Sequence, residues 1–153
     1  NYFFIFFCLI TLLNGLNFID GVNGLTSGYF FLINLIIYLL LINILHENQL
    51  IKDLNFLLIK IYFVFFILNI LGKCFFGDNG IYVSLICNSF ILINVFKANF
   101  DIISPYFIAS LLWYPAFENL FSLFRRIYKK LNVSYADKLH LHQLIFNYLI
   151  RYY

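Results

Sequence analysis

Carboxylates, amides and histidines gather in three short polar segments of an otherwise apolar chain. Asp20 lies in NGLNFIDGVNGLTSG, residues 14–28, where four glycines and three asparagines occur within fifteen residues. Asp78 lies in FFGDNG, and the block ADKLHLHQ holds His140 and His142. Carboxylates beside glycines and amide oxygens suit a hard divalent cation. Histidines beside basic residues can donate hydrogen bonds to phosphate oxygens.

Each segment also has a purely structural interpretation. Aspartate often caps a helix N-terminus, so Asp20 and Asp78 could serve neighbouring helices. Residues 14–28 could be an ordinary interhelical loop, but we favour a functional polar turn, because each interior glycine costs a helix roughly 1 kcal/mol. His140 and His142 lack the i, i+4 spacing of a helical zinc pair. Their two-residue spacing puts them on different sides of a helix but on one side of an extended segment.

The composition excludes a water-soluble domain. The chain is 63% hydrophobic and 11% charged, whereas soluble domains carry about 25% charged residues. A helix that crosses the hydrocarbon core needs roughly 20 apolar residues. We therefore predict an all-α polytopic transmembrane bundle with about five spans, forming one integral membrane domain over residues 1–153. The expected spans are an incomplete run ending near residue 13, then residues 25–45, 56–71, 81–96 and 105–124.

Basic residues are divided unequally between the two sides of this bundle. Because successive loops alternate, loops 14–24, 72–80 and 125–143 should share one face. That face carries Lys73, Arg125, Arg126, Lys129, Lys130, Lys138 and Arg151, and the other carries Lys52, Lys60 and Lys97. Lysine and arginine favour the cytoplasmic side. We therefore expect all three polar segments to face the cytoplasm, although Lys129 and Lys130 are better explained as membrane anchors.

The ordered motifs resemble those of the polyprenyl-phosphate N-acetylhexosamine-1-phosphate transferases. The motifs are NxxNFIDGVNGL, GKxFxGDxG, and RR followed by DKxHLH, and they cover essentially the whole chain. The common-antigen and teichoic-linkage branch fits better than the peptidoglycan branch. The resemblance implies an enzyme of the bacterial inner membrane that transfers an N-acetylhexosamine-1-phosphate, or a related sugar-1-phosphate, from a UDP-sugar to polyprenyl phosphate, releasing UMP. It implies Mg²⁺ as cofactor, with Mn²⁺ as an alternative, membrane lipid and a homodimer as partners, and no nucleic acid.

The resemblance also assigns roles to individual residues. The catalytic positions are Asp20, Asp78, His140 and His142, and Asp78 is the Mg²⁺ ligand. The substrate-binding positions are Asn17, Asn23, Lys73, Phe75, Gly77, Arg126 and Gln143. Phe75 would lie against the uracil ring, and Gly77 belongs to the same nucleotide pocket.

Two departures and one absence qualify the resemblance. Asn23 and Gln143 stand where many relatives have aspartate and histidine. The family's adjacent aspartate pair is not in these residues, so we expect an internal, C-terminal-half fragment of a longer transferase, inactive alone, with the pair encoded upstream. The alternative is a non-catalytic or degenerate membrane protein, or an anion transporter, that keeps these loops without transferring sugar phosphate.

Overall fold

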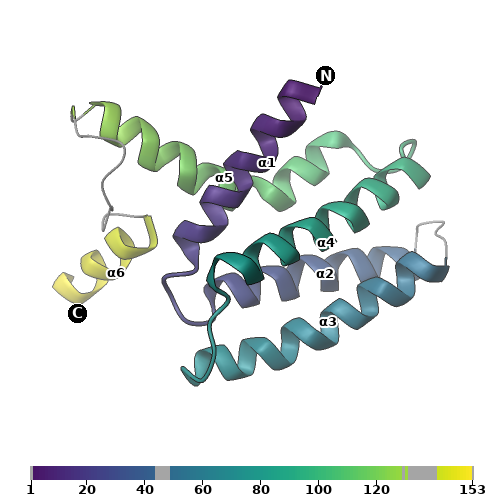
Figure 1. Cartoon of the computed structure of the whole chain (residues 1–153), viewed down its shortest axis with the longest axis horizontal. Helices are drawn as coiled ribbons and strands as arrows, with labels where there is room; N and C mark the ends of the chain where they lie inside the picture. Colours follow the sequence, from purple (N-terminus) through teal and green to yellow (C-terminus); the bar gives the residue numbers. More distant parts are fainter. Residues whose placement is uncertain (1, 44–48, 129, 131–140, 153) are drawn as a thin grey trace. The chain divides into compact units, whose positions relative to one another are not determined.

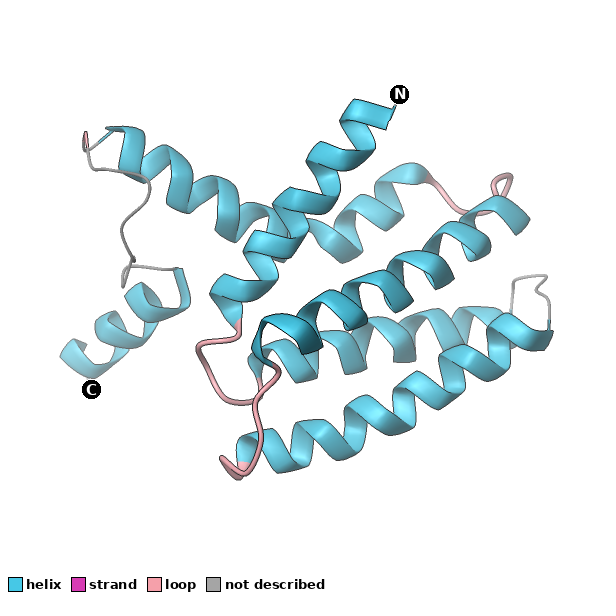
Figure 2. Ribbon diagram, viewed as in Figure 1, coloured by secondary structure: helices cyan, strands magenta, loops and turns pink. Residues whose placement is uncertain are grey.

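The described part of the chain is built from helices alone. The computed structural model describes residues 2–43, 49–128, 130 and 141–152, and no strand occurs among them. The helices are α1 (Tyr2–Ile19), α2 (Leu25–Asn43), α3 (Gln49–Ile70), α4 (Gly77–Ala98), α5 (Pro105–Tyr128) and α6 (Leu141–Tyr152) (Figures 1 and 2). The predicted all-α class is confirmed.

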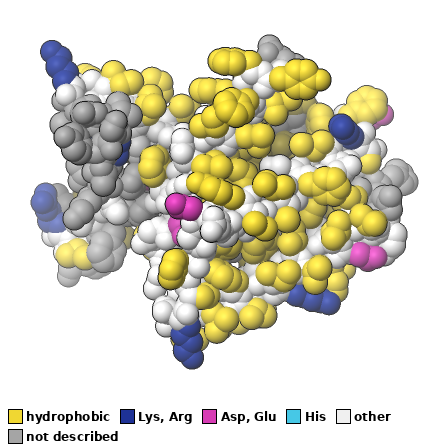
Figure 3. All heavy atoms as spheres, viewed as in Figure 1, with side chains coloured by type: hydrophobic (Ala, Val, Ile, Leu, Met, Phe, Trp, Pro, Cys, Tyr) yellow, Lys and Arg dark blue, Asp and Glu magenta, His cyan; other side chains and the backbone are white. Residues whose placement is uncertain are grey.

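Five of these helices, α1 to α5, are long and apolar enough to cross a membrane. They contain 18 to 24 residues, which at 1.5 Å per residue is about 27–36 Å, close to the thickness of a hydrocarbon core. The molecular face in Figure 3 is largely hydrophobic, with few charged side chains. The described residues therefore form the predicted polytopic bundle.

The polar segment at residues 14–28 is mostly helical, so the prediction of a turn over its whole length is wrong. Helix α1 continues to Ile19 and α2 begins at Leu25, which leaves a turn of residues 20–24. Gly15 supports the longer helix because it lacks a Cβ. A Cβ there would lie 1.9 Å from the Pro115 carbonyl oxygen, so glycine permits close packing of α1 on α5 that outweighs its low helix propensity.

Residues 20–111 form one compact unit, in which α2, α3 and α4 run side by side (Figure 1). Its centre contains buried amides whose N–H groups donate hydrogen bonds, which is important because an unpaired polar group in hydrocarbon is costly. Asn34 Nδ2 donates to Asn88 Oδ1 at 2.6 Å, and Asn88 Nδ2 donates to the Tyr62 hydroxyl at 2.9 Å. Asn55 Nδ2 donates to the Asn34 carbonyl at 3.3 Å. These bonds link all three helices inside the apolar bundle.

A proline inside α5 explains one further contact of this unit. Pro115 has no N–H and so cannot donate to the carbonyl of Leu111 four residues earlier. The Tyr29 hydroxyl donates to that carbonyl instead, at 2.9 Å. A side chain of α2 thereby satisfies an acceptor that the proline leaves open in α5.

The second compact unit comprises residues 1–19 and 112–153. Within it, Asn119 Nδ2 of α5 donates to the Thr11 carbonyl of α1 at 3.2 Å. Glu118, fully buried in α5, accepts the N–H of Leu141 at 2.7 Å. Leu141 is the first residue of α6, so this carboxylate stabilises the positive end of the helix dipole.

Candidate active site

The Asp20 carboxylate lies at the N-terminus of α4. Its Oδ2 accepts the N–H of Gly77, the first residue of that helix, at 3.2 Å. Asp78 follows in the first helical turn, and its charge acts on Asp20. The structure thus brings two of the predicted catalytic residues together, although 57 residues of sequence separate Asp20 from Gly77. It also places two of the three polar loops at the same end of their unit, as the alternation of loops predicts.

Burial raises the pKa of the Asp20 carboxyl above its usual value. The N–H of Gly77 and the hydroxyl of Thr26 both lower it, whereas the negative charge of Asp78 raises it further. The net effect is that the ionised form of this half-buried carboxylate is destabilised, at a cost in free energy. A positive charge bound between the two aspartates would reduce that cost.

Asp78 has a different environment from Asp20. Its side chain is exposed, and Phe76 rather than Asp78 occupies the cap position of α4. The structural interpretation that Asp78 caps a helix is therefore wrong, whereas Asp20 does serve a helix end, namely that of α4. Asp78 remains accessible to a ligand approaching from outside the bundle.

The two aspartates fit a hard cation better than a zinc ion. Among the described residues, no three histidine, cysteine or acidic side chains lie close enough together to hold a metal ion. Mg²⁺ is usually held by one or two carboxylates and completes its shell with water and substrate phosphates. One half-buried and one exposed carboxylate at a helix N-terminus match that requirement.

Further predicted binding residues lie on the same two turns. Phe75 is 79% exposed just before α4, so the face of its ring is open to a planar group such as a base. Lys73 and Asn23 are exposed as well, and Gly77 has a positive φ of 60° that glycine adopts without strain. The two aspartate-bearing turns therefore also present a lysine ammonium group, an amide and an aromatic ring to the outside.

A sequence comparison identifies the class of protein to which this site belongs. The family model of glycosyl transferase family 4 matches residues 1–96. The chain belongs to glycosyl transferase family 4. No curated protein and no solved structure matches it. Family membership supports a polyprenyl-phosphate sugar-1-phosphate transferase type of function in general, and with the five apolar helices it indicates a multi-pass membrane protein.

The remaining predicted site residues of this family 4 protein belong to the other compact unit. Asn17 is half-buried in α1, Arg126 is buried near the end of α5, and Gln143 is half-buried in α6. His142 lies in the first turn of α6, and His140 lies outside the described residues. That these residues share one site with Asp20 and Asp78 stays a prediction.

Two residues, one in each compact unit, hold segments that carry predicted site residues of the family 4 protein, and neither was predicted from the sequence. Asn69 of α3 bonds to both aspartate-bearing turns, and Glu118 holds the start of the helix that carries His142 and Gln143. A polar or ionisable side chain within an apolar span marks a functional site by default. Both residues carry that signal, but it does not indicate which segments they bind.

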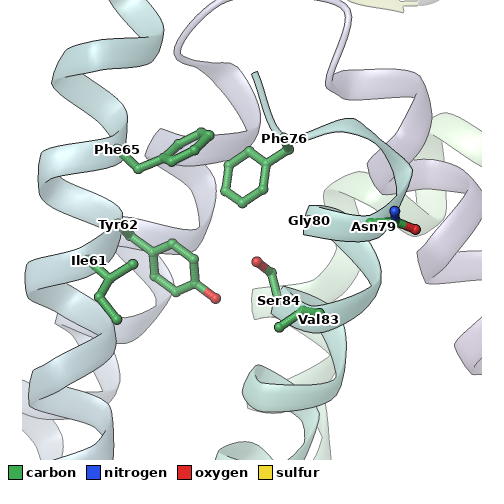
Figure 4. Close-up of a pocket in the computed structure, with 8 residues that line it drawn as sticks. All are labelled: Ile61, Tyr62, Phe65, Phe76, Asn79, Gly80, Val83 and Ser84. Carbon is green, nitrogen blue, oxygen red and sulfur yellow. The ribbon is translucent and has the colours of Figure 1, made fainter. Parts of the chain in front are cut away.

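A groove of about 380 Å³ lies beside the turns, between α3 and α4 (Figure 4). The rings of Phe65 and Phe76, with centroids 4.3 Å apart, form one end of it. The Tyr62 and Ser84 hydroxyls lie on opposite walls. Its lining is Ile61, Tyr62, Phe65, Phe76, Asn79, Gly80, Val83 and Ser84. The mostly apolar walls suit hydrocarbon rather than a nucleotide.

Proposed function

We propose that this family 4 protein transfers an N-acetylhexosamine-1-phosphate, or a related sugar-1-phosphate, from a UDP-sugar to a polyprenyl phosphate. UMP is the second product. The observation that supports this most is the meeting of Asp20 with the first turn of α4, because it brings two carboxylates together at one end of an apolar bundle. A water-soluble donor and a membrane-anchored acceptor can both reach such a position.

The electrostatics of the reaction explain why aspartates would be used there. The donor pyrophosphate and the acceptor phosphate are both anionic, so they repel each other and repel the two carboxylates. A bound Mg²⁺ would supply the positive charge that brings them together and stabilises the leaving group. Transfer of this type depends mainly on positioning and charge stabilisation, which agrees with a site formed by short turns that hydrogen bonds hold in place.

The chain's own residues divide these tasks in the proposal. Asp78, exposed in the first turn of α4, holds the cation, and Asp20 completes the anionic site from the adjacent turn. Phe75 offers its exposed ring to the uracil, and Lys73 neutralises donor phosphate. The positive end of α4 adds further stabilisation for anionic oxygens.

The test is transfer of labelled sugar phosphate by membranes that contain the complete gene product. Wild-type membranes supplied with a panel of labelled UDP-sugars and Mg²⁺ should form a labelled polyprenyl lipid and an equal amount of UMP. Asp78→Asn removes the charge of the cation ligand, so the rate should fall about 10²–10³-fold, the equivalent of a few kcal/mol. The donor that is used identifies the sugar.

A matched control is Asp101→Asn. Asp101 is exposed in the turn after α4, at the other end of that helix, so its neutralisation should leave the rate unchanged. Equal activity of wild type and Asp78→Asn, or labelled lipid from neither, would contradict the proposal and favour a non-catalytic membrane protein.

A further inference from the structure

We propose that Asn69 is a positioning residue that holds the two aspartate-bearing turns in register. Asn69 lies one residue before the end of α3 and is only 4% exposed. The inference rests on the proposed function, because a positioning role is meaningful only if the turns form a working site.

One buried amide joins three segments of the chain. Asn69 Oδ1 accepts the N–H of Gly24 at 2.6 Å and the hydroxyl of Ser27 at 3.0 Å. Asn69 Nδ2 donates to the carbonyl of Cys74 at 2.7 Å. The same side chain therefore contacts the turn after Asp20, the first turn of α2 and the segment that leads into α4.

These bonds complete a ring of contacts around the site. The turn of residues 20–24 is fastened at its first residue, where Asp20 binds Gly77, and at its last, where Gly24 binds Asn69. The segment before α4 is fastened at Cys74 and again at Gly77. Loss of the Asn69 side chain would therefore release Gly24 in the first turn and Cys74 in the second from their hydrogen bonds.

Asparagine has the chemistry that this position requires. The site presents two donors on one side and a carbonyl acceptor on the other, and an amide has an acceptor oxygen and a donor nitrogen. The nearby end of α3 is already satisfied by backbone bonds, from Gly72 N to the Asn69 carbonyl at 3.0 Å and from Lys73 N to the Leu68 carbonyl at 2.9 Å. The side chain is thus not needed to close the helix and can serve the turns.

The experiment compares Asn69→Ala with Asn88→Ala in the complete membrane-embedded protein. Asn88 is a matched control because it is equally buried and also takes part in three hydrogen bonds, with Asn34, Tyr62 and the Ser84 carbonyl. Those bonds lie inside the bundle rather than at the turns. Both variants should lower the thermal midpoint, so stability alone does not distinguish them.

Three readouts do distinguish them. Since a misplacement of about 1 Å can cost 10²-fold in rate, Asn69→Ala should lower kcat per folded molecule about 10–100-fold and raise the Mg²⁺ concentration for half-maximal rate. Maleimide labelling of Cys74, measured by mass spectrometry on the peptide that contains this cysteine, should become several-fold faster. The reason is that the Cys74 carbonyl loses its hydrogen bond from Asn69. Asn88→Ala should change none of these per folded molecule.

Ser27→Ala provides a second variant if Asn69→Ala does not accumulate. It removes one of the two donors to Asn69 Oδ1 with little change in volume, so each readout should move in the same direction by a smaller amount. Asn69→Ala that matches Asn88→Ala in kcat, Mg²⁺ dependence and Cys74 labelling would overturn the inference. If wild type transfers no sugar phosphate, the proposed function fails. Unchanged Cys74 labelling in both Asn69→Ala and Ser27→Ala would independently refute the positioning role of Asn69.

Discussion

At the scale of single residues, the role proposed for Asp20 conflicts with the stability of the fold. Burial is the largest influence on this carboxyl and raises its pKa, and Asp78 adds to the effect. The folded protein consequently binds a proton at Asp20 more readily than the unfolded chain does. Above the raised pKa the folded state must carry a destabilised charge, so stability falls as pH rises through the interval between the ordinary and the raised pKa.

Asp20→Asn should therefore stabilise the protein near neutral pH when divalent cations are removed with a chelator. The asparagine oxygen can still accept the Gly77 N–H, but the cost of the charge is gone, so the thermal midpoint should rise by about 1–3 °C. The gain should vanish below about pH 4, where the wild-type carboxyl is protonated too. Asp101→Asn, in an exposed turn, should show no such pH-dependent gain, and a lower midpoint for Asp20→Asn at neutral pH would contradict the pKa assignment.

The two aspartates were recognisable from the sequence because aspartate flanked by glycine between apolar runs is an unusual pattern. Asn69 was not recognised, since its importance lies in contacts with Gly24, 45 positions away, and with Ser27, 42 positions away. A single asparagine near the end of an apolar span gives no indication of what it binds. The meeting of the two aspartate-bearing loops was predictable from local motifs and the alternation of loops, and the support given by distant side chains was not.

At the scale of helices, the hydropathy pattern located the five spans but not their ends. Predicted ends fell where polar or glycine residues appear, yet α1 runs six residues beyond residue 13, and α4 begins four residues before Ile81. In each case a tertiary contact stabilises the extra turn. Gly15 of α1 packs against Pro115 of α5, and Asp20 accepts the N–H of Gly77, the first residue of α4. Local propensity cannot include either contribution.

Gly15→Ala tests the packing of α1 against α5. Its Cβ would meet backbone atoms of Pro115 at 1.9–3.0 Å, so the helices must separate, and we expect a loss of about 1–3 kcal/mol, typical of overpacking. Thermal unfolding in detergent measures it. Gly28→Ala is the control, because its Cβ would meet the Phe66 ring at 2.9 Å, and a side chain can move where a backbone cannot. An equal or greater loss for Gly28→Ala would show that the α1–α5 crossing is not tightly packed.

At the scale of the whole molecule, the distribution of charge and the paired loops predict an orientation in the membrane. The turns at residues 20–24 and 72–76 meet at one end of their unit, and Lys73 lies in the second of them. The turn after α4 lies at the other end of that helix and holds the exposed Asp101. If the loops rich in lysine and arginine face the cytoplasm, Cys74 and residue 101 lie on opposite sides of the membrane.

A membrane-impermeant maleimide can decide this orientation with a native cysteine and one substitution. In intact cells or right-side-out vesicles, Asp101→Cys should be labelled while Cys74 stays protected, and inverted vesicles should reverse the pattern. Peptide-level mass spectrometry separates both sites from Cys8 and Cys87, which lie within α1 and α4 and serve as internal controls for leakage of the reagent into the membrane. Labelling of Cys74 from outside would place the aspartates away from cytoplasmic nucleotide sugars. Because a UDP-sugar is charged and does not cross a bilayer unaided, that result would remove the donor from the proposed reaction even if every contact around Asp20, Asp78 and Asn69 were correct.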